Sequence, residues 1–160
     1  MPENGVKTFD GFDYVIVGAG TAGCVLANRL SADPDVNVLL LEAGGKDNYF
    51  WIKIPVGYLY TMGNPRTDWC FETEKEAGLN GRALNYPRGR TLGGCSAING
   101  MIYMRGQARD YDQWRQMGNA GWSWDDVLPV FRESEDFAHG EGDLHGTGGE
   151  WPSPWAKSSD

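Results

Sequence analysis

The feature that most constrains the fold is a glycine-rich turn between an apolar run and an amphipathic run. The turn is Gly18–Gly23, with the sequence GAGTAG. Before it, Phe12–Val17 (FDYVIV) is the β-branched and aromatic run typical of a buried strand. After it, Ala22–Ser31 carries apolar and small side chains on one helical stripe, and Val36–Leu41 (VNVLLL) indicates a second apolar strand. The order strand, helix, strand predicts a right-handed parallel βαβ unit.

Each glycine of this turn has its own predicted task. Gly18 makes the tight turn, Gly20 lets the backbone approach a diphosphate, and Gly23 lets the helix pack closely on the strand. A diphosphate held there meets the N–H groups at the start of the helix, at Thr21 and Ala22. The motif therefore predicts a site for an ADP-containing dinucleotide.

An acidic residue ends the second strand at the position that such a site requires. Glu42 stands about 20 residues beyond Gly23, where a carboxylate accepts hydrogen bonds from the adenosine ribose hydroxyls. Its charge disfavours a 2′-phosphate, which argues against NADP. FAD and NAD share this loop, but Ala43 is followed by Gly44 and Gly45, where the chain can turn beneath the ribose, and this favours FAD. A nicotinamide-dependent dehydrogenase stays open as an alternative.

The segment after the second strand is irregular. Gly44–Arg88 contains no clean helical pattern, and its aromatic-rich part, Tyr49–Tyr60, indicates a functional excursion. Trp69–Thr73 (WCFET) predicts a short strand. Arg90–Asn99 is a second glycine turn that runs into small residues, and Ile102–Met104 indicates a brief extended piece.

Two helices are predicted in the last third of the chain. The first is Asp110–Met117, opened by an acidic residue suited to capping. The second starts with a capping-box-like pair, Ser123 and Asp126, and runs to about Asp136. The Gly-, Pro- and Ser-rich segment His139–Asp160 is predicted to be loop.

The second glycine turn carries a resemblance to a known family. Gly89–Asn99 (GRTLGGCSAIN) is followed by Tyr103-x-Arg105-Gly106 and by Asp110-Tyr111-Asp112. Together with VIVGAGTAG and LLLEAG, this resembles the glucose–methanol–choline (GMC) oxidoreductases, in particular the choline-dehydrogenase-like alcohol dehydrogenases, from about Phe12 to Gly149. The resemblance implies an α/β fold: a Rossmann-like FAD-binding domain with a parallel βαβ sheet, incomplete here, with an irregular excursion and helices.

The resemblance also implies flavin contacts. Independently of it, paired glycines at 93 and 94 let main-chain N–H groups face a planar polar ligand. The expected contacts of this segment are Arg90, Leu92, Gly94, Ser96, Asn99, Gly100, Met101 and Ile102. Ile98 stands where choline oxidases of the family carry a histidine bonded to flavin, so the FAD is expected to be non-covalent. Cys95 is interpreted as a small buried filler.

Family chemistry is hydride removal from an alcohol carbon to flavin N5 while a base takes the hydroxyl proton. The family's base comes from a C-terminal part that this chain does not contain, so no catalytic residue is assigned, and the chain alone is expected to be inactive. The expected partners are an alcohol substrate and the remaining C-terminal portion of the enzyme. The predicted organisation is a leader over 1–11, the FAD-binding portion over 12–150 and a divergent tail over 151–160, as in a truncated or partial chain. A non-catalytic flavin-binding remnant is the alternative.

Other clusters receive ordinary interpretations. His139 and His145 are expected to be structural or exposed to solvent, and Glu133, Glu135 and Asp136 are interpreted as a solvated helix end, with no metal site. Five tryptophans are interpreted as packing residues rather than a carbohydrate platform: Trp114, Trp122, Trp124, Trp151 and Trp155.

Composition narrows the partners and the compartment. The net charge of −8 disfavours binding to nucleic acid or to an anionic membrane. The three cysteines lack metal-ligand spacing and suit reduced thiols. The longest apolar run, Val36–Ala43, is too short to span a bilayer, and the N-terminal residues do not resemble a signal peptide. A cytoplasmic location is expected.

Overall fold

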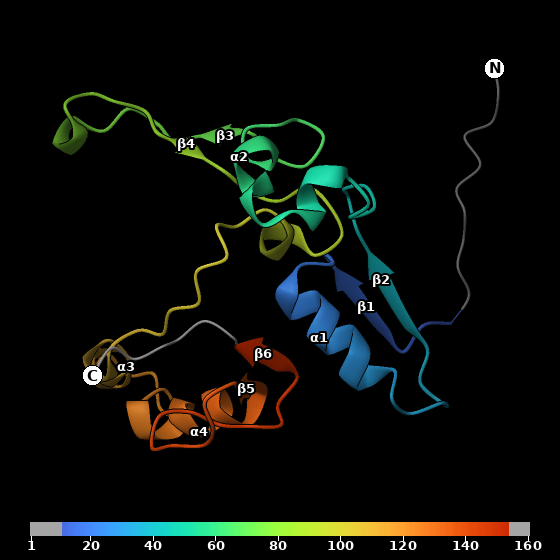
Figure 1. Ribbon diagram of the computed structural model, residues 1–160, viewed down its shortest axis with the longest axis vertical. Helices are drawn as coiled ribbons and strands as arrows, with labels where there is room; N and C mark the ends of the chain where they lie inside the picture. The colour runs from blue at the N-terminus through green and yellow to red at the C-terminus, as the bar shows by residue number, and fades with distance from the viewer. Residues whose placement is uncertain (1–10, 154–160) are drawn as a thin grey trace. The chain divides into compact units, whose positions relative to one another are not determined.

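The computed structural model describes residues 11–153 (Figure 1). The chain divides into two compact units, one ending at Ile102 and the other beginning at Tyr103. Residues 1–10 of the predicted leader and residues 154–160 of the predicted tail lie outside the described residues.

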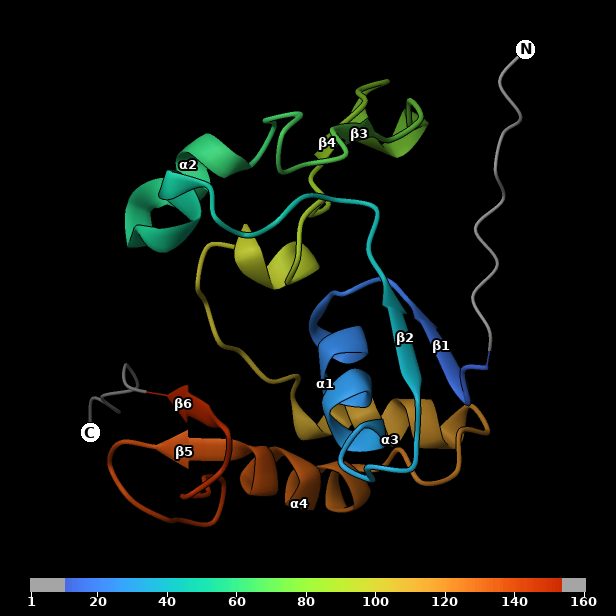
Figure 2. The ribbon, with the colours of Figure 1, turned by 90° about the vertical axis from the view of Figure 1, so that its right-hand side faces the viewer.

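The first unit contains the predicted βαβ unit. Strand β1 (Tyr14–Val17) pairs in parallel with strand β2 (Val38–Leu41), with Tyr14 opposite Val38 and Val17 opposite Leu41. Helix α1 (Thr21–Leu30) connects them and contacts both strands (Figure 2). The prediction of strand, helix and strand is confirmed, with each end shifted by at most two residues. The parallel register places Val17 and Leu41, and the loops that follow them, at one edge of the sheet.

The pattern of Phe12–Val17, which is typical of a buried strand, is not matched by burial in the described residues. Ile16 is the one buried side chain of β1, whereas Val15 is 56% exposed and Val17 is 83% exposed. A parallel strand is fully buried only when both faces of the sheet are covered. Helix α1 contacts the sheet, and the remaining apolar surface of the strands stays accessible among residues 11–153.

The irregular excursion folds into short pieces. Two 3₁₀ turns, Phe50–Lys53 and Pro55–Gly57, lead into the single-turn helix α2 (Tyr58–Thr61). Strand β3 (Phe71–Glu72) falls inside the predicted strand at 69–73 and pairs antiparallel with β4 (Asn85–Tyr86), which the sequence pattern did not predict. The predicted extended piece at 102–104 forms no strand.

One buried carboxylate organises this excursion. Asp68 is 1% exposed, and its side chain accepts hydrogen bonds from the backbone N–H groups of Gly63 (2.7 Å), Cys70 (3.0 Å) and Arg88 (2.8 Å). Burial raises the pKa of Asp68, but these N–H groups, together with that of Trp69, outweigh burial and hold the pKa below its usual range. The ionised carboxylate thus joins the segments before and after the β3–β4 hairpin.

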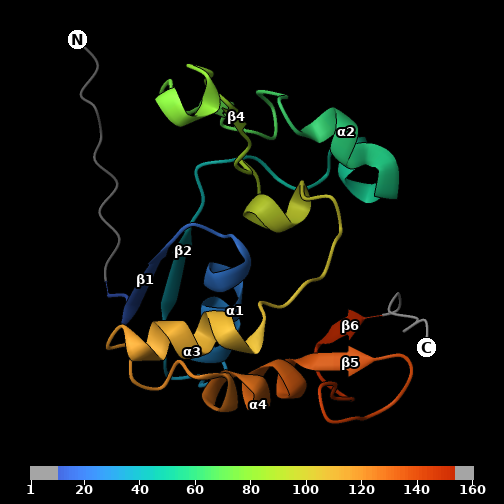
Figure 3. The ribbon, with the colours of Figure 1, turned by 90° about the vertical axis from the view of Figure 1, so that its left-hand side faces the viewer.

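The second unit is built on two capped helices, α3 (Ala108–Gln116) and α4 (Trp124–Ser134), which pack on each other (Figure 3). The capping box predicted for α4 is confirmed, since Ser123 and Asp126 bond reciprocally. In α3 the N-cap is Gln107. Asp110, which was predicted to open the helix, instead occupies the N3 position of the capping box. The helix begins earlier because Asp110 bonds back to the N–H of the cap.

Helix α4 ends at Ser134, before the predicted Asp136, and continues as strand β5 (Glu135–Phe137). This strand pairs in parallel with β6 (Trp151–Ser153), with Phe137 opposite Ser153. The prediction of loop from His139 onwards is therefore wrong at residues 151–153. Pro152 argued against a strand in the sequence, because proline is tolerated only in edge strands. A two-stranded sheet consists of two edge strands, so proline can be accommodated in β6.

Aromatic side chains form the core of the second unit. Tyr111 is buried and contacts Trp114, Trp124 and Phe131 with ring centroids 5.4–5.9 Å apart. The packing prediction is confirmed for Trp114 and Trp124, and Trp122 packs edge-on against Trp114. Trp151 stacks on Tyr103, and Trp155 lies outside the described residues.

Candidate cofactor site

The two glycine segments, far apart in sequence, are joined main chain to main chain in the first unit. The N–H of Gly93 donates to the carbonyl oxygen of Ala19 at 2.7 Å, and Gly20 and Gly93 form a parallel bridge. A Cβ added at Gly94 would lie 2.9 Å from the Cα of Gly20, so the second turn needs glycine to approach the first. The 3₁₀ turn at Gly94–Ala97 also packs on α1.

The three glycines of the first turn stand in three different physical environments. Gly18 has φ +96°, a conformation that L side chains rarely adopt. A Cβ at Gly23 would lie 1.9 Å from the carbonyl oxygen of Gly18, so the contact between helix and turn excludes one. Gly20 has an ordinary φ of −77°, and a Cβ there would meet no protein atom within 4 Å. Nothing within the described residues requires glycine at position 20, and the open space beside it is available to a ligand.

The end of β2 is fastened to the second glycine turn. A Cβ at Gly44 would lie 2.2–2.3 Å from backbone atoms of Arg90 and Thr91. The carbonyl oxygen of Gly45 accepts hydrogen bonds from the N–H of Leu92 (2.8 Å) and the hydroxyl of Thr91 (3.1 Å). These contacts hold the segment after Glu42 against the turn that carries the second motif.

Glu42 is held in place by the loops on both sides of it. Its Oε2 accepts from the N–H of Ala19 at 2.8 Å, and its Oε1 accepts from the N–H of Gly44 at 2.7 Å. Each carboxylate oxygen has a further lone pair, so Glu42 can also accept from the hydroxyl groups of a ligand. The side chain therefore positions the first glycine loop and offers acceptors at the same time.

Two cavities adjoin these segments within the first unit. The larger, with a volume of about 580 Å³, is lined by Val17, Gly18, Gly20, Leu41, Glu42, Ala43, Trp69, Phe71, Arg88, Gly89, Gly94 and Cys95. The second, of about 330 Å³, is lined by polar groups of the second turn together with aromatic residues of the excursion. Both volumes are of the order found for ligand clefts.

The predicted contact residues divide among these cavities. The larger cavity is lined by Gly18, Gly20, Glu42, Ala43 and Gly94. The smaller is lined by Leu92, Ser96, Asn99 and Met101. Neither is lined by Thr21, Ala22, Gly23, Arg90, Gly100 or Ile102. Ile102 is 77% exposed, and the guanidinium of Arg90 lies 4.9 Å from the ring centroid of Trp69.

Several lining residues were missed by sequence reasoning. Trp69, Phe71 and Arg88 line the larger cavity, and Trp51 and Tyr58 line the smaller one. The aromatic residues of the predicted strand at 69–73 were the available signal, but Trp69 lies outside β3 and Cys70 has φ +54°, so strand alternation does not place the two rings. The pairing of this strand with residues 85–86, which brings Arg88 beside Trp69, had no local signal.

The interpretation of Cys95 as a buried filler is wrong. Cys95 is exposed and lines the larger cavity, and its sulfur accepts a long hydrogen bond from the N–H of Gly89 (3.4 Å). Cys24 is half-buried and Cys70 is exposed, and all three cysteines are free thiols. A Cβ added at Gly89 would lie 2.1–2.7 Å from backbone atoms of Gly94 and Cys95, so it is glycine at position 89 that this approach requires.

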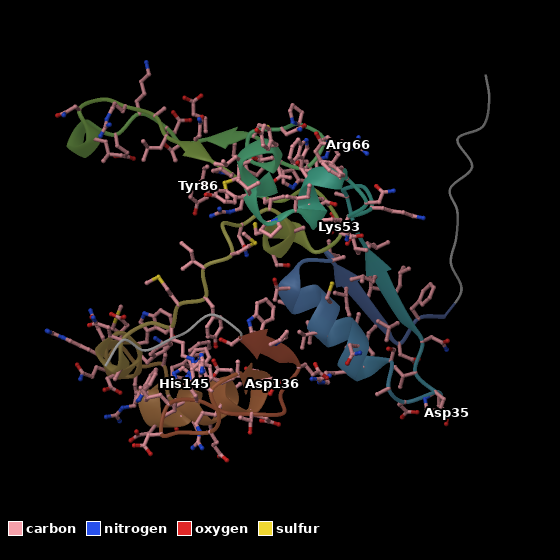
Figure 4. The ribbon with its side chains drawn as sticks, in the orientation of Figure 1. Asp35, Lys53, Arg66, Tyr86, Asp136 and His145 are labelled. Carbon is pink, nitrogen blue, oxygen red and sulfur yellow. The ribbon has the colours of Figure 1, made fainter. Side chains whose placement is uncertain are left out.

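Glu135, interpreted as part of a solvated helix end, is instead buried and ion-paired in the second unit. Its side chain is 0% exposed, and Oε2 accepts from Arg105 (2.7 Å), His145 (2.9 Å) and the N–H of Gly146 (3.3 Å). Burial raises the pKa of Glu135, but the hydrogen bond from His145, the charge of Arg105 and the Gly146 amide outweigh it, and the pKa lies below its usual range. His145, labelled in Figure 4, stacks on Phe137 with ring centroids 3.9 Å apart, the structural role expected of it.

The described residues contain neither a metal-ligand cluster nor a membrane-spanning helix. Between residues 11 and 153, no three His, Cys, Asp or Glu side chains are grouped so that they could hold a metal ion. Over this same range no helix combines the length and the apolar character needed to cross a bilayer.

The larger cavity suits the ADP half of a dinucleotide. Space beside Gly20 is open at the start of α1, where the first N–H groups of a helix have no partner within the helix. Helix α1 has no side-chain cap and no acidic residue in its first turn, so no side chain of the helix itself competes with an anion there. Glu42 offers acceptors for sugar hydroxyls in the same cavity. Donors, acceptors and space thus fit such a group.

Comparison with solved structures defines the class of protein. The chain superposes on pyridoxine 4-oxidase from Mesorbium loti with a TM-score of 0.82 and 44% identity, covering 89% of this chain and 28% of that one. It superposes on an FAD-dependent oxidoreductase from Chaetomium thermophilum with a TM-score of 0.72 and 33% identity, covering 89% and 26%. The chain therefore has the α/β fold of FAD-binding oxidoreductases.

Sequence comparison defines the family. The model of the GMC oxidoreductase family matches residues 12–152, and the chain belongs to this family. It is 53% identical to the oxygen-dependent choline dehydrogenase of Photobacterium profundum over 138 residues, which cover 86% of this chain and 24% of that protein. It is 43% identical to the mitochondrial choline dehydrogenase of Homo sapiens over 152 residues, or 91% of this chain and 26% of that protein. The chain spans about a quarter of the length of these curated relatives.

Proposed function

We propose that residues 12–150 are the FAD-binding portion of an oxidoreductase that acts on the CH–OH group of an alcohol. The observation that carries the proposal is the junction of the two glycine segments at a cavity that also contains Glu42. Membership of the GMC family supports FAD as the dinucleotide. Relatives named choline dehydrogenase, and one from Pseudomonas putida named alcohol dehydrogenase [acceptor], support an alcohol as the substrate class.

The chain's own residues would bind and orient the cofactor in a Rossmann-like βαβ unit. Gly18 and Gly20 leave the start of α1 open to the diphosphate, and Glu42 accepts from the adenosine ribose. Ser96 and Asn99, on the wall of the smaller cavity, provide hydrogen-bonding groups for the flavin ring. The chemistry that bound FAD supplies is acceptance of a hydride from the alcohol carbon.

The proposed attachment is non-covalent. Ile98 is 3% exposed and packs in the first unit, so this position presents an inert side chain that is withdrawn from solvent. Isoleucine has no atom that can form a bond to flavin. The cofactor would therefore be held by main-chain amides, Glu42 and polar contacts alone.

The proton acceptor for the substrate hydroxyl is assigned to no residue of this chain. His145 is engaged by Glu135 and stacked on Phe137, a structural arrangement. The alcohol substrate, and the C-terminal portion that supplies the base, thus belong to the function proposed for the whole enzyme. Alone, the chain would bind FAD without turning over an alcohol.

The proposal is tested first by FAD binding and then by turnover of alcohols. Titration of the 160-residue chain into FAD should quench flavin fluorescence with saturation, and NAD should compete no better than ADP, the part that the two dinucleotides share. Saturable NAD binding without FAD binding would favour the nicotinamide-dependent alternative. Incubation with FAD, a panel of primary alcohols and an artificial electron acceptor should give no turnover, and turnover by this chain would overturn the assignment of the base to another segment.

A further inference from the structure

Four side chains lie close together at the β3–β4 hairpin: Trp69, Phe71, Tyr86 and Arg88. Trp69 and Arg88 lie just outside the two strands, and Cys70, between Trp69 and Phe71, has φ +54°. Phe71 lies opposite Tyr86, and the N–H of Trp69 donates to the carbonyl oxygen of Arg88 at 2.9 Å, so these two pairs are neighbours across the hairpin. The guanidinium of Arg88 lies 3.6 Å from the ring centroid of Tyr86, which Figure 4 labels on this hairpin.

The two aromatic rings next to the cavity are flat and accessible. The rings of Trp69 and Phe71 are parallel within 3°, with centroids 5.9 Å apart. Trp69 is 42% exposed and Phe71 is 51% exposed, and both line the larger cavity. The guanidinium of Arg90 lies 4.9 Å from the centroid of Trp69 and so helps to hold that ring. Parallel, partly exposed rings at a cavity wall are suited to stack on a planar ligand.

We propose that Trp69 and Phe71 form the platform on which the adenine ring of the dinucleotide stacks. This inference rests on the proposed function and names a part of the same site. The rings share their cavity with Gly20 and Glu42, where the diphosphate and the adenosine ribose are proposed to bind. Adenine is bonded directly to that ribose, so it must occupy space adjoining Glu42. Stacking of a base on an aromatic side chain contributes substantially to nucleotide affinity in proteins that use it.

The adenine ring is favoured over the flavin ring as the occupant. The polar groups proposed for the flavin ring, Ser96 and Asn99, line the smaller cavity, which does not include Trp69 or Phe71. The ribose that is proposed to donate hydrogen bonds to Glu42 belongs to the adenosine half of the dinucleotide. Position in the site therefore assigns the aromatic platform to the purine.

Charge supports the same assignment. The chain carries a net charge of −8, yet Arg88 lines this cavity and Arg90 lies against its tryptophan. One N–H of Arg88 donates to the carbonyl oxygen of Pro87 at 2.7 Å, and the guanidinium fork has further donors suited to a phosphate. A local excess of cations in an acidic protein complements a nucleoside diphosphate.

The experiment uses ADP and adenosine as probes and needs no enzyme activity. The 160-residue chain and its Trp69→Leu and Trp69→Phe variants are titrated with each ligand by calorimetry, and with FAD by flavin fluorescence. Trp69→Leu should weaken all three ligands by about 5- to 100-fold, whereas Trp69→Phe should retain most of the affinity because it retains a flat ring. The matched control is Trp122→Leu, which removes a 51% exposed tryptophan from the second unit and should leave binding unchanged.

A second measurement keeps the test valid if Trp69→Leu fails to fold. In the unmodified chain, the indole N–H resonance of Trp69, assigned with Trp69→Phe, should shift on addition of ADP, while that of Trp122 should not. FAD binding with unchanged affinity in Trp69→Leu, or no shift of the Trp69 resonance at saturating ADP, would overturn the platform and leave the proposed function standing. ADP binding at Trp69 without FAD binding would support the platform and count against the flavin assignment. Absence of binding by both FAD and ADP would overturn both.

Discussion

The carboxylate of Glu42 accepts a hydrogen bond from the N–H of Ala19 at 2.8 Å, which ties the end of β2 to the first glycine loop. Its other oxygen accepts from Gly44 at 2.7 Å. The residue that sequence reasoning assigns to the ligand is thus also a structural link between two loops. Variants of Glu42 therefore act on the shape of the site and on its acceptors together.

Glu42→Gln should impair both stability and FAD binding. The amide group of glutamine would place an N–H₂ donor against the N–H of Ala19 or Gly44, so one backbone donor loses its acceptor. An unsatisfied group of this kind costs about 1–3 kcal/mol. We expect a lower melting temperature and at least a roughly tenfold weaker FAD affinity. The control is Glu74→Gln in the same unit, an exposed residue outside both cavities, which should change neither.

Gly20→Ala and Gly23→Ala should separate ligand binding from packing. A Cβ at Gly20 meets no protein atom within 4 Å, so alanine should leave the melting temperature close to that of the parent while weakening FAD binding. At Gly23 a Cβ would lie 1.9 Å from the oxygen of Gly18, and overpacking of this kind costs about 1–3 kcal/mol or more. Thermal unfolding and FAD titration check both, with Gly78→Ala as the open-space control. Equal FAD affinity in Gly20→Ala and the parent would contradict the predicted approach of the diphosphate.

Flavin loaded onto this chain should be released by denaturation. Ile98 is 3% exposed and offers no bonding atom, so precipitation of the loaded protein with acid should leave the yellow colour in the supernatant. The measurement is the ratio of flavin absorbance in the supernatant to that in the washed pellet. Flavin that stays with the pellet after washing would contradict non-covalent attachment.

The second unit should lose stability in acid through Glu135. Because its pKa in the folded protein lies below its usual range, Glu135 contributes stability at pH values above the usual glutamate range. That contribution is lost as the pH falls through this range toward the pKa of the folded state, from about pH 5 downwards. Near-ultraviolet circular dichroism of the aromatic cluster, recorded against temperature at each pH, should show this loss.

Removal of Glu135 tests the ion pair between Glu135 and Arg105 at neutral pH. Glu135→Ala leaves the guanidinium of Arg105, whose side chain is 11% exposed, without its carboxylate, and breaking such a pair costs about 3–5 kcal/mol. Glu133→Ala, at an exposed neighbouring position, should have little effect. A pH profile of Glu135→Ala that falls as steeply as that of the parent would show that other groups govern the acid transition.

The features predicted correctly depend on residues close together in sequence. Two local signals were correct. One is the order of strand, glycine turn, helix and strand at 14–41, and the other is the capping box formed by Ser123 and Asp126. The prediction of a cofactor site at the glycines and Glu42 uses the same kind of sequence signal, and it stays a prediction. In each case a short stretch of chain contains both the constraint and the group that satisfies it.

The features that were missed depend on partners distant in sequence. Glu135 is buried because Arg105 lies 30 positions away and donates to it, and nothing near Glu135 indicates that partner. The aromatic wall of the cavity needs the register of Phe71 with Tyr86, and β6 needs Pro152 at a sheet edge. The exposure of Val17 likewise depends on what covers the sheet rather than on the strand's own residues.

The hydrogen bond between Ala19 and Gly93 also determines how late in translation the first loop can reach its final structure. The first loop cannot complete its main-chain bond until the polypeptide has been synthesised past position 93 and that stretch has left the exit tunnel. During this interval, as in the folded unit, the strands carry accessible valine and leucine side chains, a condition that favours association with other chains. Slow translation between these two positions would lengthen that interval, and a chaperone that binds extended apolar segments would have its opportunity there.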